Sequence, residues 1–165
     1  MTPLQPPDCY YFSAAEGWAA LGSYSDALAE LERLSRPLQD HPDVLLLRWH
    51  ICAKLKEWTA CIEVGWRLVA AAPDQLASWQ NYANSLFYAK RYQDAFDALF
   101  PAIEKFPAEW SIPYNLACYV CQMDKLDEAQ SWFKMALSLG DADQVKKQAL
   151  SDPDLGPLKK TILAM

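Results

Sequence analysis

A repeat of 34 residues is the feature that most restricts how this chain can fold. One row at this spacing contains only small residues: Ala27, Cys61, Ala95 and Ala129. Two other rows contain mostly large side chains: Tyr24, Trp58, Tyr92 and Leu126, and Tyr11, Leu45 and Trp79. Pro73 and Pro107 are also one period apart. A constant period in several independent rows indicates an array of similar structural units.

The copy from Trp79 to Pro107 shows what one unit contains. Apolar residues recur at helical spacing on both sides of the polar Lys90-Arg91 pair, and Pro107 closes the second run. This pattern predicts two antiparallel amphipathic helices that are joined by a tight turn. One such hairpin cannot bury its own apolar face, so neighbouring copies must cover it.

These rows resemble the tetratricopeptide repeat family. A 34-residue unit of that family has an aromatic residue opening its first helix, a small residue midway, a Tyr opening the second helix and a Pro at its end. The resemblance implies an all-α fold, a right-handed α-solenoid of about four helix–turn–helix hairpins with C-terminal capping helices. The implied repeats lie at about 8–41, 42–75, 76–109 and 110–140, after a proline-rich tail (1–7) and before the capping helices (141–165).

Prolines and helix-start residues modify this outline. Asp8 is a good N-cap for the first helix. Pro37 is expected to end the second helix, which leaves a loop over 37–42. Pro101 lies inside a predicted helix and removes a backbone hydrogen bond, so we expect a kink over 97–101.

Two residues of the second repeat break the pattern of side-chain size. Trp49 stands at a position that is alanine in the other three repeats, and Gly65 stands where the others have Leu or Phe. An added Trp in a closely packed helix crossing should cost about 1–3 kcal/mol if nothing else moved. We interpret the pair as an exchange in which Gly65 makes room for the Trp49 ring.

Beyond Gly140 the period ends. The sequence predicts one helix over 141–150 and a last short helix that begins near Gly156. The run from Asp152 to Leu155 resembles the closing segment of many bacterial proteins of the family, where it caps the open end of the array. This favours a bacterial source.

Composition excludes several classes of partner. An apolar fraction of 52% in 165 residues is ample for a packed core. The net charge of −6, without a basic cluster, argues against nucleic acid and anionic membrane surfaces. We find no apolar run of membrane-spanning length and no secretory signal pattern. Five cysteines, an odd number within helical patterns, fit a reducing compartment, so a cytoplasmic location is expected.

Cys118 and Cys121 form a CxxC motif, which is compatible with a redox pair or with half of a zinc site. Redox chemistry of the thioredoxin type needs this motif at a helix start after a strand, whereas here it lies within a predicted helix. A structural zinc site needs two more ligands at suitable spacing. We interpret both residues as thiols on one helix face, Cys52 and Cys61 as core residues, and Cys9 as the most reactive cysteine.

The remaining residues do not form a recognisable catalytic pattern. The two histidines, His41 and His50, have no Ser or Cys partner at a known spacing, and the five glycines are scattered singly. We therefore expect no enzymatic activity, no metal and no cofactor.

The resemblance also implies a concave groove, lined by the first helix of each repeat, that binds an extended peptide or a helix. Transferring those positions gives the partner-binding candidates Phe12, Glu16, Leu46, His50, Gln80, Asn84, Phe87, Tyr114, Cys118 and Cys121. One subclass of the family holds a partner's C-terminal carboxylate with Lys, Asn and Arg on these rows, and of those residues only Asn84 has a counterpart here. An aromatic and aliphatic groove with a few amides is expected instead.

The main functional hypothesis is a non-enzymatic module that binds a peptide segment or helix of a partner protein. One alternative is a class II secretion-type chaperone for apolar translocator proteins, which resembles this chain in size, acidity and apolar groove. Another is a metal- or thiol-dependent protein that uses Cys118, Cys121 and His50. A third is a homo-oligomer in which the proline-rich start docks in a neighbour's groove.

Overall fold

The computed structural model describes residues 4–165, so part of the expected tail at 1–7 lies outside the described residues. Within the described range the regular structure is entirely helical, without a strand. The elements are α1 (Asp8–Ala20), α2 (Tyr24–Glu32), η1 (Arg36–Leu38), α3 (Pro42–Leu55), α4 (Trp58–Ala71), α5 (Leu76–Tyr88), α6 (Tyr92–Leu99), α7 (Ala102–Lys105), α8 (Ser111–Cys121), α9 (Leu126–Leu139), α10 (Ala142–Ser151), η2 (Pro153–Leu158) and α11 (Lys159–Leu163). The predicted all-α class is confirmed.

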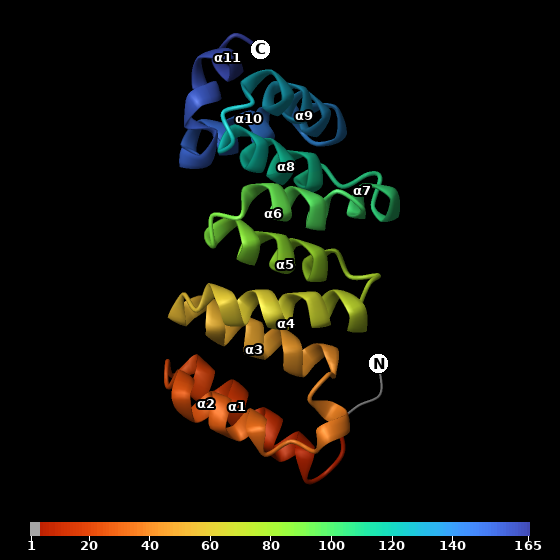
Figure 1. The fold of residues 1–165 in the computed structure, drawn as a ribbon. Helices are drawn as coiled ribbons and strands as arrows, with labels where there is room; N and C mark the ends of the chain where they lie inside the picture. The colour runs from red at the N-terminus through yellow and green to blue at the C-terminus, as the bar shows by residue number, and fades with distance from the viewer. Residues whose placement is uncertain (1–3) are drawn as a thin grey trace. The chain divides into compact units, whose positions relative to one another are not determined.

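The chain divides into two compact units, one ending at Ser85 and the other running from Leu86 to Met165. In the first unit, α1 packs with α2 and α3 packs with α4 (Figure 1). In the second unit, α8 and α9 form the equivalent pair. These are the helix–turn–helix hairpins that the 34-residue period predicts. The boundary between the units falls inside α5 and not at a repeat limit.

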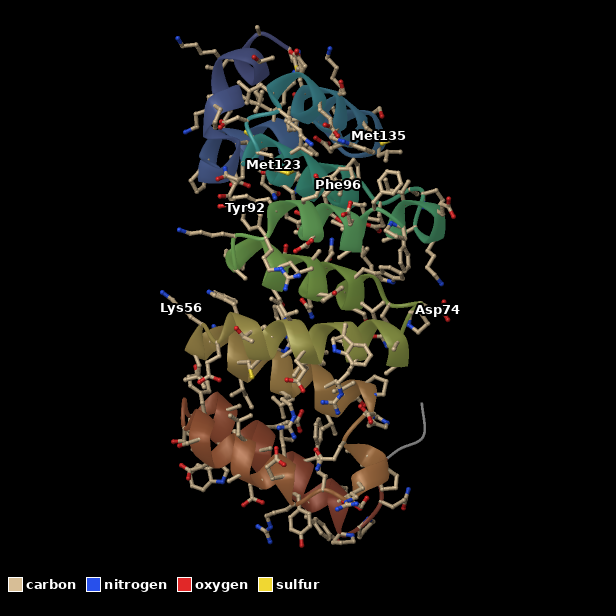
Figure 2. The ribbon with its side chains drawn as sticks, in the orientation of Figure 1. Lys56, Asp74, Tyr92, Phe96, Met123 and Met135 are labelled. Atoms are coloured by element: carbon tan, nitrogen blue, oxygen red, sulfur yellow. The ribbon has the colours of Figure 1, made fainter. Side chains whose placement is uncertain are left out.

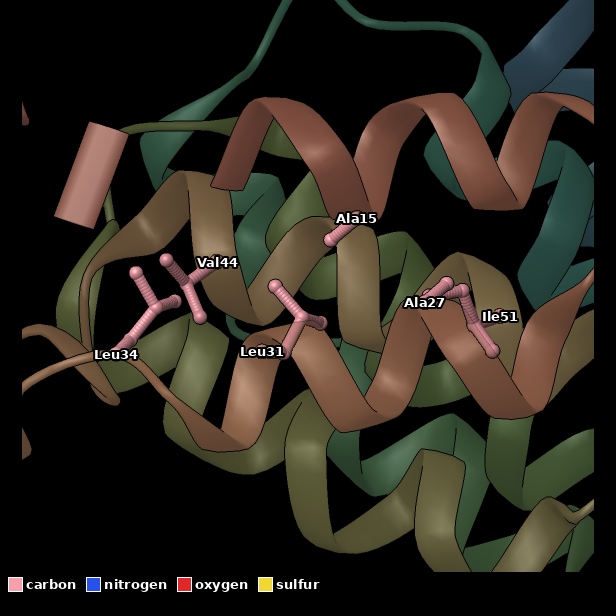
Figure 3. Packing of buried hydrophobic residues seen from close by; sticks show 6 residues of the cluster. All are labelled: Ala15, Ala27, Leu31, Leu34, Val44 and Ile51. Atoms are coloured by element: carbon pink, nitrogen blue, oxygen red, sulfur yellow. The ribbon is translucent and has the colours of Figure 1, made fainter. Parts of the chain in front are cut away.

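Small residues allow the helices of the first unit to approach each other. Ala15 on α1 and Ala27 on α2 are fully buried in the same cluster as Leu31, Val44 and Ile51 (Figure 3). The row of small residues one period apart is fully buried at all four positions: Ala27, Cys61, Ala95 and Ala129. Close packing of this kind has little room for a larger side chain.

The four hairpin turns repeat one backbone conformation. A left-handed residue, with φ between 58° and 79°, follows the first helix of every repeat at Gly22, Lys56, Lys90 and Asp124. At Lys56, which Figure 2 labels, the amide donates to the Ala53 carbonyl at 3.1 Å and the next amide donates to the Cys52 carbonyl at 3.0 Å. This pairing satisfies the carbonyls at the helix end. The residue type signals such a turn at Gly22 and, more weakly, at Asp124, but not at Lys56 or Lys90.

Replacing Lys90 by glycine is expected to raise the free energy of unfolding by about 0.5–1 kcal/mol. The left-handed conformation costs a residue with a Cβ about 1–2 kcal/mol, and the greater freedom of glycine in the unfolded chain offsets part of that gain. Lys90 is exposed, so little packing is lost. Urea denaturation measures the change, and Gly22→Ala should shift stability in the opposite direction. A destabilised Lys90→Gly protein would contradict the turn geometry.

Pro101 breaks the hydrogen-bond ladder of its helix, although Phe100 and Pro101 keep helical backbone angles. The segment that the sequence predicts as one kinked helix consists of α6, which ends at Leu99, and α7, which begins at Ala102. The amide of Ile103 donates to the carbonyl of Phe100, only three residues earlier, at 3.2 Å. Proline has no amide hydrogen and its ring crowds the preceding turn, so the regular ladder cannot continue.

The first repeat differs from the sequence prediction at both ends of its hairpin. Asp8 is the first residue of α1, whose N-cap is Pro7, and the Asp8 carboxylate accepts hydrogen bonds from the amide (2.6 Å) and hydroxyl (3.2 Å) of Ser35. The start of α1 is thereby tied to the chain just after α2. α2 ends at Glu32, earlier than expected, and the side-chain amide of Gln39 donates to the carbonyls of Leu31 and Leu34 near that end.

The prediction that Gly65 makes room for the Trp49 ring is wrong, because Gly65 faces Tyr82. A Cβ added at Gly65 on α4 would lie 2.9 Å from the Cα of Tyr82 on α5, and its three nearest atoms all belong to Tyr82. The Trp49 indole N–H instead donates to the Ser85 hydroxyl at 2.8 Å, and that hydroxyl donates to the carbonyl of Asn81. Gly65 therefore permits a close approach of α4 and α5.

The C-terminal residues form a cap on the second unit. The Asp141 carboxylate accepts a hydrogen bond from the amide of Gln144 at the start of α10. The segment after α10 is the 3-10 turn η2 followed by α11, where the sequence predicts one short helix. Leu155, Leu158 and Ile162 from this segment are buried.

Candidate functional site

Four of the predicted site residues border one pocket in the first unit. Phe12 and Glu16 come from α1, and Leu46 and His50 come from α3. Residues four apart lie on the same face of a helix, so each helix presents two of these side chains to the same space. The pocket has a volume of about 320 Å³, and Asp43 and Leu47 complete its lining.

A smaller pocket of about 110 Å³ adjoins the first one. Its lining includes Ala19, Tyr24, Ile51 and Lys54, and it shares Leu47 and His50 with the larger pocket. We call the two pockets together the α1–α3 groove. Phe12, Leu46 and Leu47 are partly exposed, whereas Glu16, Asp43 and His50 are exposed. The groove therefore combines accessible apolar surface with charged groups at its rim.

The charges in the groove are unevenly distributed. Glu16 and Asp43 border the larger pocket, and Lys54 borders the smaller one. Partial burial, and then the nearby charge of Lys54, lower the pKa of His50 below its usual value, so the imidazole is neutral at pH 7. Asp43 lies 3.6 Å from Nδ1 of His41 at the start of α3. The larger pocket is thus acidic.

Gln80 and Asn84, the predicted groove amides of the third repeat, lie on α5 one period after Leu46 and His50. Both side chains are half-buried, and each already makes an interaction within the protein.

The predicted groove residues of the second unit are buried, which corrects the expectation that they lie open to a partner. The exposed fractions are 8% or less for Phe87, Tyr114, Cys118 and Cys121. The Tyr114 hydroxyl donates to Oδ2 of Asp152 at 2.8 Å, and the Cys118 thiol lies 3.9 Å from the same oxygen. Segment 152–158 therefore covers the face of α8 that the sequence assigns to a partner.

Two further contacts show how this part of the second unit is closed. The side-chain amide of Gln122 donates to the Asp154 carbonyl at 2.9 Å. The Phe87 ring packs on the rings of Tyr92 and Tyr119, with centroids 5.4 and 5.1 Å away. Sequence reasoning missed Gln122 and Asp152 as parts of this contact. Gln122 is one helical turn after Cys118, which is the only signal that the sequence offers.

The buried thiols are poorly suited to chemistry. Burial raises the pKa of Cys61 to about 12. Burial is also the main cause that raises the pKa of Cys118 and of Cys121, with nearby Asp152 and Asp124 adding to the respective shifts. A thiol with a raised pKa is a weak nucleophile at neutral pH, which disfavours a redox role. Residues 4–165 contain no cluster of three or more His, Cys, Asp or Glu side chains that is arranged to hold a metal ion.

Brief treatment with iodoacetamide at pH 8 is expected to modify Cys9 well before any other cysteine. Cys9 is partly exposed, whereas Cys52, Cys61, Cys118 and Cys121 are buried. Peptide mass spectrometry after a timed quench measures each site, and a urea-unfolded sample gives the unprotected rates. Modification of Cys118 at its unfolded rate in the native protein would contradict the closed arrangement around Asp152.

No helix within residues 4–165 combines the length and the apolar character that crossing a lipid bilayer requires.

Sequence comparison gives no match to a family model. No curated protein matches the sequence either. Solved structures do match in fold. The crystal structure of MamA has a TM-score of 0.76 at 16% identity, with 95% of this chain and 86% of that chain covered.

Two other matching structures are described as TPR proteins. YrrB, "a TPR protein with an unusual peptide-binding site", has a TM-score of 0.73 at 14% identity and covers 84% of this chain and 72% of its own. TTC0263, a thermophilic TPR protein from Thermus thermophilus, has a TM-score of 0.62 at 20% identity, with 96% and 100% covered. The chain therefore has the tetratricopeptide repeat fold.

Proposed function

We propose that this chain is a non-enzymatic protein–protein interaction module that binds a short segment of a partner protein in the α1–α3 groove. The observation that carries the proposal is the meeting of Phe12, Leu46 and Leu47, three partly exposed apolar side chains, in one pocket between two helices. Burying apolar surface against a partner stabilises the complex by roughly 25 cal/mol per Å² of apolar area removed from water. An accessible apolar pocket with a few polar groups is the usual form of a binding site.

The fold and the chemistry of the groove support this proposal. Both α1 and α3 are the first helices of their hairpins, and the fold is shared with YrrB, whose structure is described as having a peptide-binding site. Within residues 4–165, neither pocket is lined by Ser, Thr or Cys, so the groove contains no Ser–His or Cys–His pair. The five free thiols fit a reducing compartment, and we place the protein in the cytoplasm on that basis.

Selection of dodecapeptides from a random phage-displayed library tests the proposal. The best enriched peptide should bind the full chain with a Kd on the order of 1–100 μM, because a small groove must offset the entropy of ordering its ligand. Leu46→Ser should weaken that binding at least tenfold, since the substitution removes a central apolar contact.

Leu163→Ser is the matched control, because Leu163 is 73% exposed on α11 and lies outside both pockets. Circular dichroism must show that both variants fold. Equal binding by the wild-type and Leu46→Ser proteins would rule out the α1–α3 groove as the binding site.

A further inference from the structure

Within residues 4–165, no Lys or Arg lines the acidic end of the α1–α3 groove. The Glu16 side chain makes no hydrogen bond or ion pair with any residue in 4–165. The Asp43 side chain is 52% exposed, and its Oδ2 lies 3.6 Å from Nδ1 of His41. Among the described residues, His50 is the only basic group that lines the larger pocket, and its lowered pKa leaves it neutral at pH 7. Among residues 4–165, no Lys or Arg that lines the larger pocket balances these two carboxylates, which stand beside apolar surface.

The apolar part of the groove limits what can sit beside these carboxylates. The smaller pocket, at about 110 Å³, approaches the roughly 150 Å³ of apolar space that accepts one small hydrocarbon. Ala19, Tyr24 and Ile51 form its apolar wall. A single aliphatic side chain matches this space. Because the two pockets share Leu47 and His50, residues close together in a bound segment can occupy both.

We propose that the partner of the α1–α3 groove is a basic, aliphatic peptide segment: a Lys or Arg whose cation lies between Glu16 and Asp43, next to an aliphatic residue that enters the smaller pocket. The inference rests on the proposed function and specifies its partner. The methylene stem of the basic residue covers Phe12 and Leu46 while its charged head stays at the rim. An Arg can form paired hydrogen bonds with a carboxylate, which favours Arg over Lys.

The charge of the whole chain also favours a basic partner segment. The chain carries a net charge of −6, which attracts a basic segment and repels an acidic one. Complementary charge of this kind contributes more to specificity and to the association rate than to affinity. Lys54 lines the smaller pocket, where its positive charge repels a basic residue. A segment that is basic along its whole length is therefore not the best fit.

The library selection gives the first test. Enriched dodecapeptides are expected to carry Lys or Arg within a few residues of Leu, Ile, Val or Met. The double variant Glu16→Gln/Asp43→Asn should raise the Kd of the best peptide about three- to tenfold, the range expected for two exposed ion pairs. Raising NaCl from about 50 to 500 mM should weaken binding to the wild type more than to the double variant.

Two controls isolate the charge effect. Asp26→Asn removes an exposed carboxylate on α2 that lines neither pocket, and it should leave the Kd unchanged. A version of the best peptide with its basic residues replaced by Gln should bind the wild type and the double variant equally.

The possible outcomes separate the two proposals. Enrichment of peptides without basic residues, or equal binding by the wild type and the double variant, overturns the partner assignment even if Leu46→Ser still abolishes binding. Unchanged binding by Leu46→Ser overturns the groove function and the partner assignment together.

A second copy of the chain is the competing occupant, because Lys160 and Leu163 are exposed together on α11. Sedimentation velocity at increasing concentration is expected to show a monomer. A dimer that the double variant dissociates would overturn the assignment of a separate partner.

Discussion

Replacing Leu155 by alanine is expected to lower the free energy of unfolding by about 2–5 kcal/mol, the usual cost of a cavity at a fully buried leucine. Leu155 has no exposed surface and lies in η2, which packs against α8, α9, α10 and α11. With neighbours on several sides, the site cannot collapse easily around the smaller side chain. The cap should loosen on α8 as a consequence.

Urea denaturation and cysteine labelling measure the two consequences separately. Leu155→Ala should lower the denaturation midpoint and speed alkylation of Cys118, whose thiol lies against Asp152 at the start of the cap. Leu163→Ala, in the same segment but 73% exposed, should change stability by less than about 0.5 kcal/mol. Equal, small effects of both substitutions would mean that the cap contributes little to the second unit.

Replacing Gly65 by valine is expected to lower the free energy of unfolding by about 3 kcal/mol, at the upper end of the usual range for overpacking. The Cβ alone would lie 2.9 Å from the Cα of Tyr82. That atom belongs to the backbone of α5 and cannot rotate away, so the two helices would have to separate. The γ methyl groups of valine add further crowding.

Gly17→Ala is the matched control for this substitution. Gly17 is also inside a helix, α1, but a Cβ at this position would meet nothing within 4 Å. The alanine should therefore raise stability by about 0.5–1 kcal/mol through its better helix propensity. Urea denaturation of both variants gives the comparison. A loss below about 0.5 kcal/mol for Gly65→Val would contradict the close approach of α4 and α5.

The repeat period predicted the hairpins because their causes are local and periodic. Apolar spacing fixes which helix face is buried, and the row from Ala27 to Ala129 marks the sites of close packing. The residue type indicated the turn conformation at Gly22 and, more weakly, at Asp124, whereas Lys56 and Lys90 show no preference for the left-handed region. At Lys56 and Lys90, only the 34-residue period indicates where the turn lies.

The α1–α3 groove was also predictable in part, since residues four apart must share a helix face. Contacts between distant segments were not predictable in this way. The resemblance indicated that the run from Asp152 to Leu155 caps the array, but Tyr114 and Asp152 are 38 residues apart, and nothing in their local sequence indicates that these two side chains meet. The partner of Gly65 was missed for the same reason, because Tyr82 belongs to the next hairpin along the chain.

The central claim is that a partner segment binds between α1 and α3, and amide chemical-shift mapping tests it most directly. The best selected peptide is titrated into the full chain, labelled with nitrogen-15, and two-dimensional spectra are recorded. The largest shifts are predicted at the amides around Phe12, Glu16, Leu46 and His50. Shifts concentrated on α8 and η2, with α1 and α3 unaffected, would contradict the claim.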